Sequence, residues 1–183
     1  ESNEKYVEPE NPVWFLPNNS KEFLWMSERD GFMHLYRYDS EGQLLNQVTK
    51  GAWVVLYILG LDAGGQHVIV EGSDESGLNR YAYRVALDGS TQQQIPTSPG
   101  VHRFQLSSTG KHLIDQYSSL TEPQIINIID LEGKVVQNLL TAKNPVEAYA
   151  FPSTEILQVN ADNGTPLHAR MIKPSHFSPD QKY

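Results

Sequence analysis

The sequence predicts an all-β protein, a partial β-propeller of about three four-stranded blades followed by a C-terminal hairpin. Short runs rich in aromatic and β-branched residues alternate with polar turns that carry Gly, Asn or Asp. This layout repeats, because Phe23 and Val68 lie 45 positions apart, as do Val68 and Leu113. A period of about 40 to 50 residues with four short strands per unit is typical of propellers. No segment sustains a helical period, so we expect almost no helix.

The strands of each unit follow one another in the same order. They are expected at residues 13–16, 23–26, 34–38 and 44–49, then 54–59, 68–70, 81–85 and 91–95, then 101–106, 113–117, 124–129 and 135–140, with a further strand at 146–151. Tyr81, Tyr83 and Val85 alternate along one strand and are expected to share a face. Asn163-Gly164 predicts a two-residue hairpin turn between strands 155–161 and 165–172.

The length of the chain is short for a closed ring. The 183 residues supply about three blades, whereas propellers usually close with about four to eight. We therefore expect either association with copies of the same chain or a place in a longer protein. The first residue is Glu1 and no terminating element precedes Tyr183, which favours the second expectation.

Composition narrows the class of partner. The net charge is −8 and the 14 Lys and Arg residues are scattered, which argues against a nucleic-acid surface. No apolar stretch is long enough to span a bilayer, and no signal peptide is visible. The chain has no cysteine, so it contains no disulfide framework and no thiolate site.

Catalytic motifs are missing from the sequence. There is no Gly-x-Ser-x-Gly elbow, and Gly72 to Gly77 reads as an ordinary turn between strands. His102 and His112 could meet across a hairpin, but no Cys or carboxylate at a matching position would complete a zinc site, so we expect no metal and no cofactor. The six histidines are expected to be partly buried, each with one ring nitrogen satisfied. On these residues alone the chain is a binding or scaffolding β-domain.

One loop could still carry recognition. Glu28, Arg29 and Asp30 could form a binding triad, although such a turn is more often solvated and held by weak ion pairs. Phe32 follows this turn at a loop-to-strand junction. Burial preferences alone place such an aromatic in the core, while its position beside a loop would hold it near solvent.

The chain carries an ordered set of distinctive segments, at residues 27–32, 34–36, 47–51, 53–55, 101–103, 106–107, 110, 142–145, 149–150, 152, 165–167, 173–174, 176–177 and 182–183. Together these segments resemble the propeller of the dipeptidyl peptidase IV and prolyl tripeptidyl peptidase branch of the prolyl oligopeptidase-type serine peptidases. The resemblance covers the chain from about Trp14 to Tyr183.

This resemblance implies a function as well as a fold. In the family, an eight-bladed propeller caps an α/β-hydrolase domain with a Ser-Asp-His triad, and the enzyme removes an N-terminal di- or tripeptide after proline. The resemblance implies that residues 1–152 hold the last blades of the propeller and that residues 153–183 hold the linking hairpin and the start of the hydrolase domain. The chain would be inactive alone. The peptide substrate would carry proline near its N-terminus, and the parent enzyme would be periplasmic or at the cell surface. Homo-oligomers through exposed strand edges are also expected.

The resemblance also assigns two site residues. Phe32 and Met33 match an aromatic residue and an arginine that line the substrate cleft of the family. The aromatic is kept, while methionine replaces the charged donor with a flexible apolar surface. Two other readings stay open: a non-enzymatic propeller that binds proteins or peptides, and a three-blade assembly that closes by oligomerising.

Overall fold

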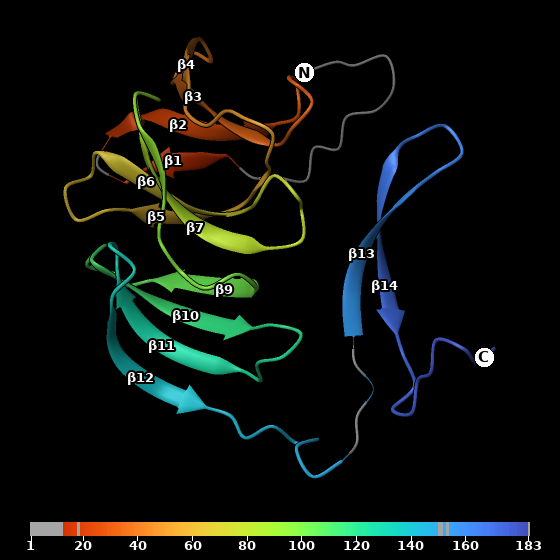
Figure 1. Ribbon diagram of the computed structural model, residues 1–183. Helices are drawn as coiled ribbons and strands as arrows, with labels where there is room; N and C mark the ends of the chain where they lie inside the picture. Colours follow the sequence, from red (N-terminus) through yellow and green to blue (C-terminus); the bar gives the residue numbers. More distant parts are fainter. Residues whose placement is uncertain (1–12, 18, 150–151, 153, 183) are drawn as a thin grey trace.

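The computed structural model describes residues 13–17, 19–149, 152 and 154–182, and every regular element in this part of the chain is a β-strand (Figure 1). Three four-stranded antiparallel sheets and one two-stranded sheet follow in chain order. The strands of the first sheet are β1 (Trp14–Leu16), β2 (Asn19–Ser27), β3 (His34–Asp39) and β4 (Leu44–Gln47). The strands of the second are β5 (Val55–Leu61), β6 (His67–Ser73), β7 (Arg80–Ala86) and β8 (Gln92–Gln94). Those of the third are β9 (Val101–Leu106), β10 (His112–Ser118), β11 (Ile125–Asp130) and β12 (Val135–Thr141), and the last sheet pairs β13 (Thr154–Asn160) with β14 (Pro166–Ile172).

The all-β prediction and the predicted four-stranded units are confirmed. Each four-stranded sheet is a simple meander whose strands pair in sequence order, and the three sheets do not close into a ring. We call them blades 1, 2 and 3. Because no helix occurs among the described residues, none of them forms a helix that could cross a membrane.

Two apolar clusters hold the blades together. The first joins blades 1 and 2 and includes Leu24, Leu35, Val70 and Tyr83. The second joins blades 2 and 3, and its buried members are Ile69, Ala82, Ile95, Phe104, Leu113 and Ile129. Tyr81, Tyr83 and Val85 all belong to the first cluster, which confirms that they share one face. Successive residues of a strand therefore pack against different neighbouring blades.

Strand alternation places the loops at two ends of each blade. The β2–β3, β6–β7 and β10–β11 loops lie at one end, and the β13–β14 hairpin runs beside that end in Figure 1. We call it the hairpin end. The β1–β2, β5–β6 and β9–β10 turns lie at the opposite end, which we call the far end.

The prediction of a strand at 146–151 is wrong over its described part. Residues 145–148 form turns and Tyr149 a bend, while residues 150–151 lie outside the described residues. Asn144 explains the difference, because its side-chain Oδ1 accepts the N–H of Val146 at 3.0 Å and its carbonyl accepts the N–H of Glu147 at 3.3 Å. Pro145 lacks an N–H and fixes φ, which favours such a turn.

The hairpin turn also differs from prediction. Ala161 and Thr165 close it with an N–H to carbonyl bond of 2.9 Å, so three residues rather than two form the loop. A two-residue type I′ turn needs positive φ at both positions, and Asn163 does not adopt it. Gly164 alone has positive φ, and Asn163 Oδ1 accepts the N–H of Thr165 instead.

Candidate functional site

The β2–β3 loop that carries the predicted site residues is braced by Asp30. The carboxylate of Asp30 accepts the side-chain amide of Gln47 at 2.7 Å and the backbone N–H of Phe32 at 3.3 Å. Burial raises the pKa of Asp30, but these hydrogen bonds outweigh it and the net shift is downward. The ionised carboxylate therefore fixes the start of the segment that presents Phe32.

Arg29 lies against aromatic rings in this turn. Its guanidinium carbon is 4.1 Å from the centre of the Tyr36 ring and 5.8 Å from that of Tyr38, and its Nε donates to Ser27 Oγ at 3.0 Å. A cation over an aromatic face is stabilised by the ring quadrupole. The observed contacts of Arg29 and Asp30 thus hold the loop in place.

Phe32 and Met33 occupy different environments. The side chain of Phe32 is 39 % exposed, so it lies outside the core. Met33 is half-buried, and its carbonyl accepts the N–H of Val55 at 2.8 Å, which ties the loop to the first strand of blade 2. Phe32 is therefore available to a ligand at the hairpin end, while Met33 anchors the loop.

A buried aromatic and histidine stack supports Phe32. The Phe32 ring lies 6.3 Å from that of His34, which meets Trp53 edge-on at 5.7 Å. Trp53 in turn stacks on Tyr83 at 4.2 Å. His34 is immobilised by hydrogen bonds of 3.0 Å from its two ring nitrogens to Thr49 Oγ1 and the Gly51 carbonyl. Such packing keeps an exposed aromatic in one orientation, which lowers the entropy lost on binding.

Tyr83 closes this stack on the side of blade 2. Its hydroxyl donates to the Ser73 carbonyl at 2.7 Å, and burial raises the pKa of Tyr83 to about 12, with nearby Asp74 adding to the shift. The hydroxyl therefore remains a donor over the physiological pH range.

The loop between the second and third strands of each blade carries an exposed apolar side chain at the hairpin end. Phe32 lies on the β2–β3 loop, Leu78 on β6–β7 and Leu120 on β10–β11, with exposures of 39, 41 and 59 %. A pocket of about 510 Å³ lies between the second and third of these loops and is closed by Ile156 of β13. Sequence reasoning missed Leu78, Leu120 and Ile156. The signal for Leu78 and Leu120 was leucine in loops that are otherwise polar, whereas Ile156 lies on strand β13 and gave no such signal.

The histidine pair considered for zinc is not brought together. His102 pairs with Tyr117 in the β9–β10 ladder, whereas His112 pairs with Asp130, so the two lie at opposite ends of β10. His102 Nδ1 lies 2.7 Å from Asp115 Oδ1 and its Nε2 lies 2.8 Å from the Ser98 carbonyl. The expectation of one satisfied ring nitrogen is wrong for His34 and His102, because both of their nitrogens are bonded.

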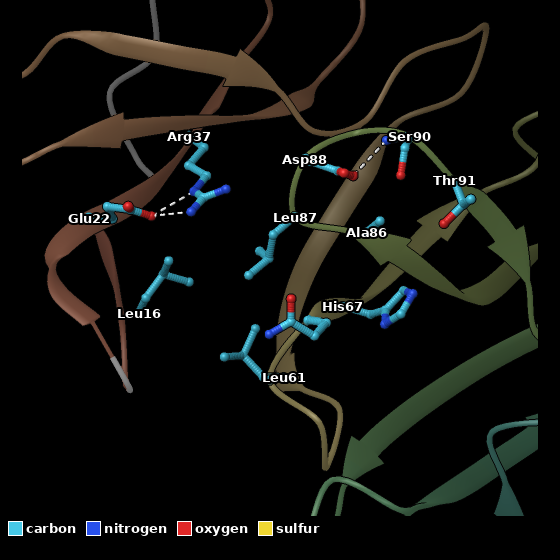
Figure 2. Close-up of a pocket in the computed structure, with 12 residues that line it drawn as sticks. Leu16, Glu22, Arg37, Leu61, His67, Ala86, Leu87, Asp88, Ser90 and Thr91 are labelled. Atoms are coloured by element: carbon cyan, nitrogen blue, oxygen red, sulfur yellow. Dashed lines mark hydrogen bonds and ion pairs between the residues drawn. The ribbon is translucent and has the colours of Figure 1, made fainter.

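A second pocket, of about 540 Å³, lies at the far end between blades 1 and 2 (Figure 2). Glu22 and Arg37 form an ion pair on one wall, with Arg37 Nε donating to Glu22 Oε2 at 2.6 Å. His67 lies on the other wall. Because the charges of Glu22 and Arg37 neutralise each other, the wall that these two residues form offers a ligand no free charge.

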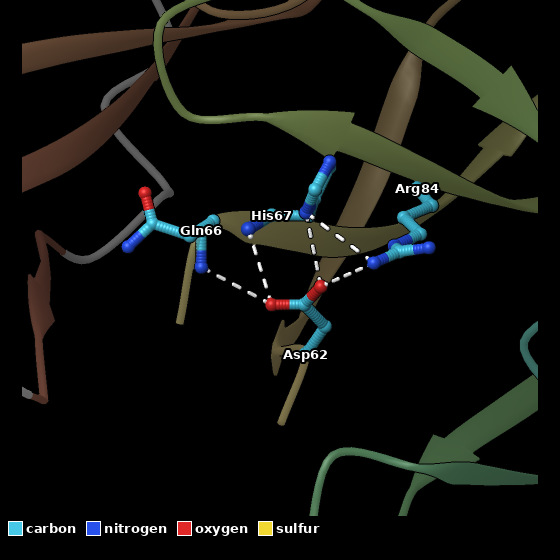
Figure 3. Close-up of polar contacts among 4 residues, drawn as sticks. All are labelled: Asp62, Gln66, His67 and Arg84. Atoms are coloured by element: carbon cyan, nitrogen blue, oxygen red, sulfur yellow. Dashed lines mark hydrogen bonds and ion pairs between the residues drawn. The ribbon is translucent and has the colours of Figure 1, made fainter. Parts of the chain in front are cut away.

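Asp62 holds His67 in place at the edge of that pocket (Figure 3). Its carboxylate accepts the backbone N–H groups of Gln66 and His67, His67 Nδ1 at 2.9 Å and Arg84 Nη2 at 2.7 Å. Burial raises the pKa of Asp62, but the hydrogen bonds from Arg84 and the two N–H groups outweigh it and the net shift is downward. This network closes the β5–β6 turn, and we assign it to the fold.

Comparisons with known proteins agree with this geometry. The family model described as the dipeptidyl peptidase IV (DPP IV) N-terminal region matches residues 1–124. A protein of Aspergillus fumigatus named dipeptidyl-aminopeptidase B is 29 % identical over 97 % of this chain and 21 % of its own length. The chain thus spans about a fifth of the curated relatives that it matches.

Solved structures extend the likeness to three dimensions. A Bacteroides ovatus protein titled as a dipeptidyl aminopeptidase IV superposes with a TM-score of 0.88 at 33 % identity, over 99 % of this chain and 29 % of that one. Porphyromonas gingivalis dipeptidyl peptidase 4 superposes with a TM-score of 0.83 at 26 % identity, over 93 % of this chain and 24 % of that one.

Proposed function

The chain belongs to the dipeptidyl peptidase IV N-terminal region family, and from this we propose that it forms the last propeller blades of a longer serine exopeptidase. That enzyme removes an N-terminal di- or tripeptide after proline. The observation that carries the proposal is the family match over residues 1–124. The similarity to the Bacteroides ovatus structure over nearly the whole chain supports it.

The chain contributes binding rather than bond cleavage in this proposal. It contains no Gly-x-Ser-x-Gly elbow, so the nucleophile is assigned to the rest of the longer protein. The hairpin end lines the substrate cleft, with Phe32 as an exposed apolar contact and Met33 beside it. We place the longer protein in the periplasm or at the cell surface, and fractionation of the native cells tests that placement.

Activity of the longer protein tests the proposal directly. The full open reading frame that encodes this chain is expected to hydrolyse chromogenic X-Pro or X-X-Pro substrates, and the chain of 183 residues alone is expected not to. Turnover by the isolated chain that survives repurification would overturn the assignment of the nucleophile. A full-length product without such activity, or a reading frame without a hydrolase region, would instead favour a non-enzymatic propeller that binds peptides or proteins.

The role of Phe32 is tested in the active full-length enzyme. Phe32→Ala is expected to lower kcat/KM at least about tenfold, because it removes apolar contact area worth more than about 1.4 kcal/mol. Leu45→Ala is the matched control, since Leu45 is 47 % exposed on the edge strand β4. Met33→Arg is expected to strengthen substrate binding by supplying a charged donor. Equal kcat/KM for Phe32→Ala and Leu45→Ala would remove Phe32 from the cleft.

We further infer that the isolated chain self-associates. Every residue of β12 is exposed, and this strand leaves one edge of blade 3 unpaired. Unpaired edges favour pairing with other chains. The third candidate for the role of the chain is a three-blade assembly that closes by association of several copies. The oligomeric mass of the purified chain tests this candidate.

A further inference from the structure

Trp53 lies in the segment that joins blade 1 to blade 2, and its ring occupies a closely fitting slot. The side chain is 6 % exposed, and its Nε1 donates to the Lys50 carbonyl at 2.9 Å. A Cβ on Gly72 would lie 2.5 Å from Trp53 Cζ3, and one on Gly51 would lie 3.0 Å from Cδ1. Because neither glycine carries a side chain, the ring fits against their backbone, and Tyr83 stacks on it at 4.2 Å. These contacts fix the position of the Trp53 ring.

The segment that carries Trp53 is fastened to blade 2 on both sides of that residue. Gln92 of β8 accepts the N–H of Lys50 through Oε1 at 3.2 Å and donates from Nε2 to the Lys50 carbonyl at 3.1 Å. Beyond Trp53, the Val54 carbonyl accepts the N–H of Ser73 at 3.0 Å, and the Val54 N–H donates to Ser73 Oγ at 3.1 Å. Trp53 is therefore held by blade 2 although it precedes that blade in the chain.

His34 connects the Trp53 ring to the β2–β3 loop of blade 1. The His34 ring meets the Trp53 ring at an interplanar angle of 75° and lies 6.3 Å from the Phe32 ring. Because the Gly51 carbonyl can only accept, His34 Nε2 donates the hydrogen of the bond between them. His34 thus touches the Trp53 segment twice, once through the rings and once through this hydrogen bond. It is fixed relative to Trp53 and is the ring neighbour of Phe32.

The orientation of the Phe32 ring depends on this pair. The side chain is 39 % exposed, so core packing does not surround it. Backbone bonds hold the loop itself, since the Met33 carbonyl accepts the N–H of Val55, but a backbone bond does not fix a side-chain torsion. The distance to His34 is within the range over which aromatic rings attract each other. The ring of Phe32 is therefore oriented by His34 and, behind it, by Trp53.

We propose that Trp53, acting through His34, is a positioning residue that orients Phe32 for the peptide substrate. Trp53 itself is buried and does not contact the peptide. Because the Phe32 ring is already oriented, less entropy is lost when the peptide binds. Loss of the Trp53 ring weakens the binding of substrate and transition state equally, which raises KM and leaves kcat unchanged. This inference rests on the proposed function, and the experiments below separate the failure of one from the failure of the other.

Kinetics of the full-length enzyme on a chromogenic X-Pro or X-X-Pro substrate test the role of Trp53. Trp53→Leu keeps an apolar side chain and removes the ring, so it is expected to raise KM at least about threefold while kcat stays within about twofold. Trp53→Phe restores an aromatic ring and is expected to bring KM back near the wild-type value. His34→Gln can still donate to the Gly51 carbonyl, perturbs the fold less, and is expected to raise KM as Trp53→Leu does.

Phe104→Leu is the matched control for Trp53→Leu. Phe104 is also a buried ring, 5 % exposed, but it belongs to the cluster between blades 2 and 3. Its replacement is expected to lower stability and to leave KM unchanged. A rise in KM that is the same in Phe104→Leu and Trp53→Leu would assign the effect to general loss of stability and would overturn the proposal.

A double-mutant cycle separates positioning from stability. In the Phe32→Ala background, Trp53→Leu and His34→Gln are each expected to leave kcat/KM unchanged, because no ring remains to be oriented. A drop in kcat/KM that is equal in the two backgrounds overturns the proposal. So does an unchanged KM in both Trp53→Leu and His34→Gln, or an active enzyme in which Phe32→Ala has no effect.

Fluorine NMR tests the orientation of Phe32 without relying on activity. In the full-length protein with a fluorinated phenylalanine in place of Phe32, Trp53→Leu is expected to shift the fluorine resonance toward its position in the unfolded protein, and Phe104→Leu is expected not to. A resonance that Trp53→Leu does not move overturns the positioning role. An inactive full-length protein whose resonance still moves would contradict the peptidase assignment and would keep Trp53 as the residue that orients Phe32.

Discussion

His102 is the most completely enclosed polar side chain of blade 3. It is 1 % exposed, and its ring is parallel to that of Phe104 at 5.3 Å and lies 4.7 Å from that of Tyr117. Its Nδ1 lies 2.7 Å from Asp115 Oδ1 and its Nε2 lies 2.8 Å from the Ser98 carbonyl, so both ring nitrogens have a buried hydrogen-bond partner. Removing one member of such a buried polar pair leaves the other, here the Asp115 carboxyl group, buried without its partner.

His102→Ala is therefore expected to lower the free energy of unfolding by about 3 to 5 kcal/mol. Urea denaturation at neutral pH measures it. His168→Ala is the control, because His168 is exposed on β14 and its loss should change stability by less than about 0.5 kcal/mol. Similar denaturation midpoints for the two variants would show that the Asp115 pair is not part of the stabilising core.

Glu71 of β6 is also a buried polar side chain, but its hydrogen bonds are incomplete. Its side chain is 1 % exposed, Oε2 accepts the N–H of Phe104 at 3.1 Å, and Oε1 has no hydrogen-bond partner. Arg80 approaches Oε1 only to 3.7 Å. Burial raises the pKa of Glu71, although Phe104 and Arg80 oppose the shift. Because the folded-state pKa is raised, the stability linked to this group is present at low pH and is lost as pH rises through that pKa.

Glu71→Gln is expected to stabilise the chain at neutral pH relative to wild type, and the gain should shrink as pH falls toward about 4. The amide oxygen of glutamine can still accept the Phe104 N–H, so the hydrogen bond to blade 3 is retained. Urea denaturation of both proteins between these pH values measures the difference. A gain that grows at low pH would contradict the direction assigned to the pKa of Glu71.

At the scale of elements, polar side chains close the turns in a repeated way. Asp39 Oδ1 accepts the N–H groups of residues 41 and 43, and Asp130 Oδ1 accepts those of residues 132 and 134. Ser107 Oγ does the same for residues 111 and 112. These side chains satisfy turn N–H groups that the ladders leave free, which explains why the turns recur with Asp, Ser and Gly.

Gly133→Ala tests how tightly the blades pack through these turns. The added Cβ would meet the Pro96 carbonyl oxygen at 2.1 Å, whereas in Gly164→Ala it meets open space at nearly the same φ. Gly164→Ala should cost about 1 to 2 kcal/mol from backbone strain alone. Gly133→Ala should cost a further 1 to 3 kcal/mol, roughly, from overpacking. Thermal unfolding measures the loss of stability in both variants. Equal losses would mean that the turn of blade 3 at Gly133 does not pack tightly against blade 2.

At the scale of the whole molecule, the carboxylates that hold the turns govern acid stability. Burial raises the pKa of Asp62 and of Asp74, but hydrogen bonds from Arg84 to the first and from Asn79 and Ser76 to the second outweigh it, so both are lowered. A lowered folded-state pKa contributes stability that is present above the unfolded value and lost as pH falls through the folded one.

The urea midpoint of the chain is therefore expected to fall steeply below about pH 4, as Asp62 and Asp74 take up protons. Asp74→Asn should flatten this decline, because asparagine cannot titrate and still accepts hydrogen bonds through its amide oxygen. Denaturation at several pH values between about 2.5 and 5 measures it. An unchanged acid profile in Asp74→Asn would assign the decline to other carboxyl groups.

Local sequence patterns were sufficient to predict the strands of the blades. They failed for the segment after β12 and for the turn between β13 and β14. Alternation and the 45-residue period located twelve strands in three sheets, because side-chain direction repeats every two residues and turn chemistry is local. The strand expected at 146–151 failed, since Asn144 offers the backbone hydrogen bonds that compete with a ladder. The two-residue hairpin failed because Asn163 avoids positive φ.

The sequence by itself determined the fold class, the repeat and the family, since these depend on patterns along the chain. It also singled out Phe32 and Met33, whose roles remain predictions. Only the tertiary structure decided which residues meet across blades: that His102 pairs with Asp115 rather than with His112, and that Leu78 and Leu120 share a pocket with Ile156. Contacts between distant segments depend on how sheets stack, and no local periodicity records that stacking.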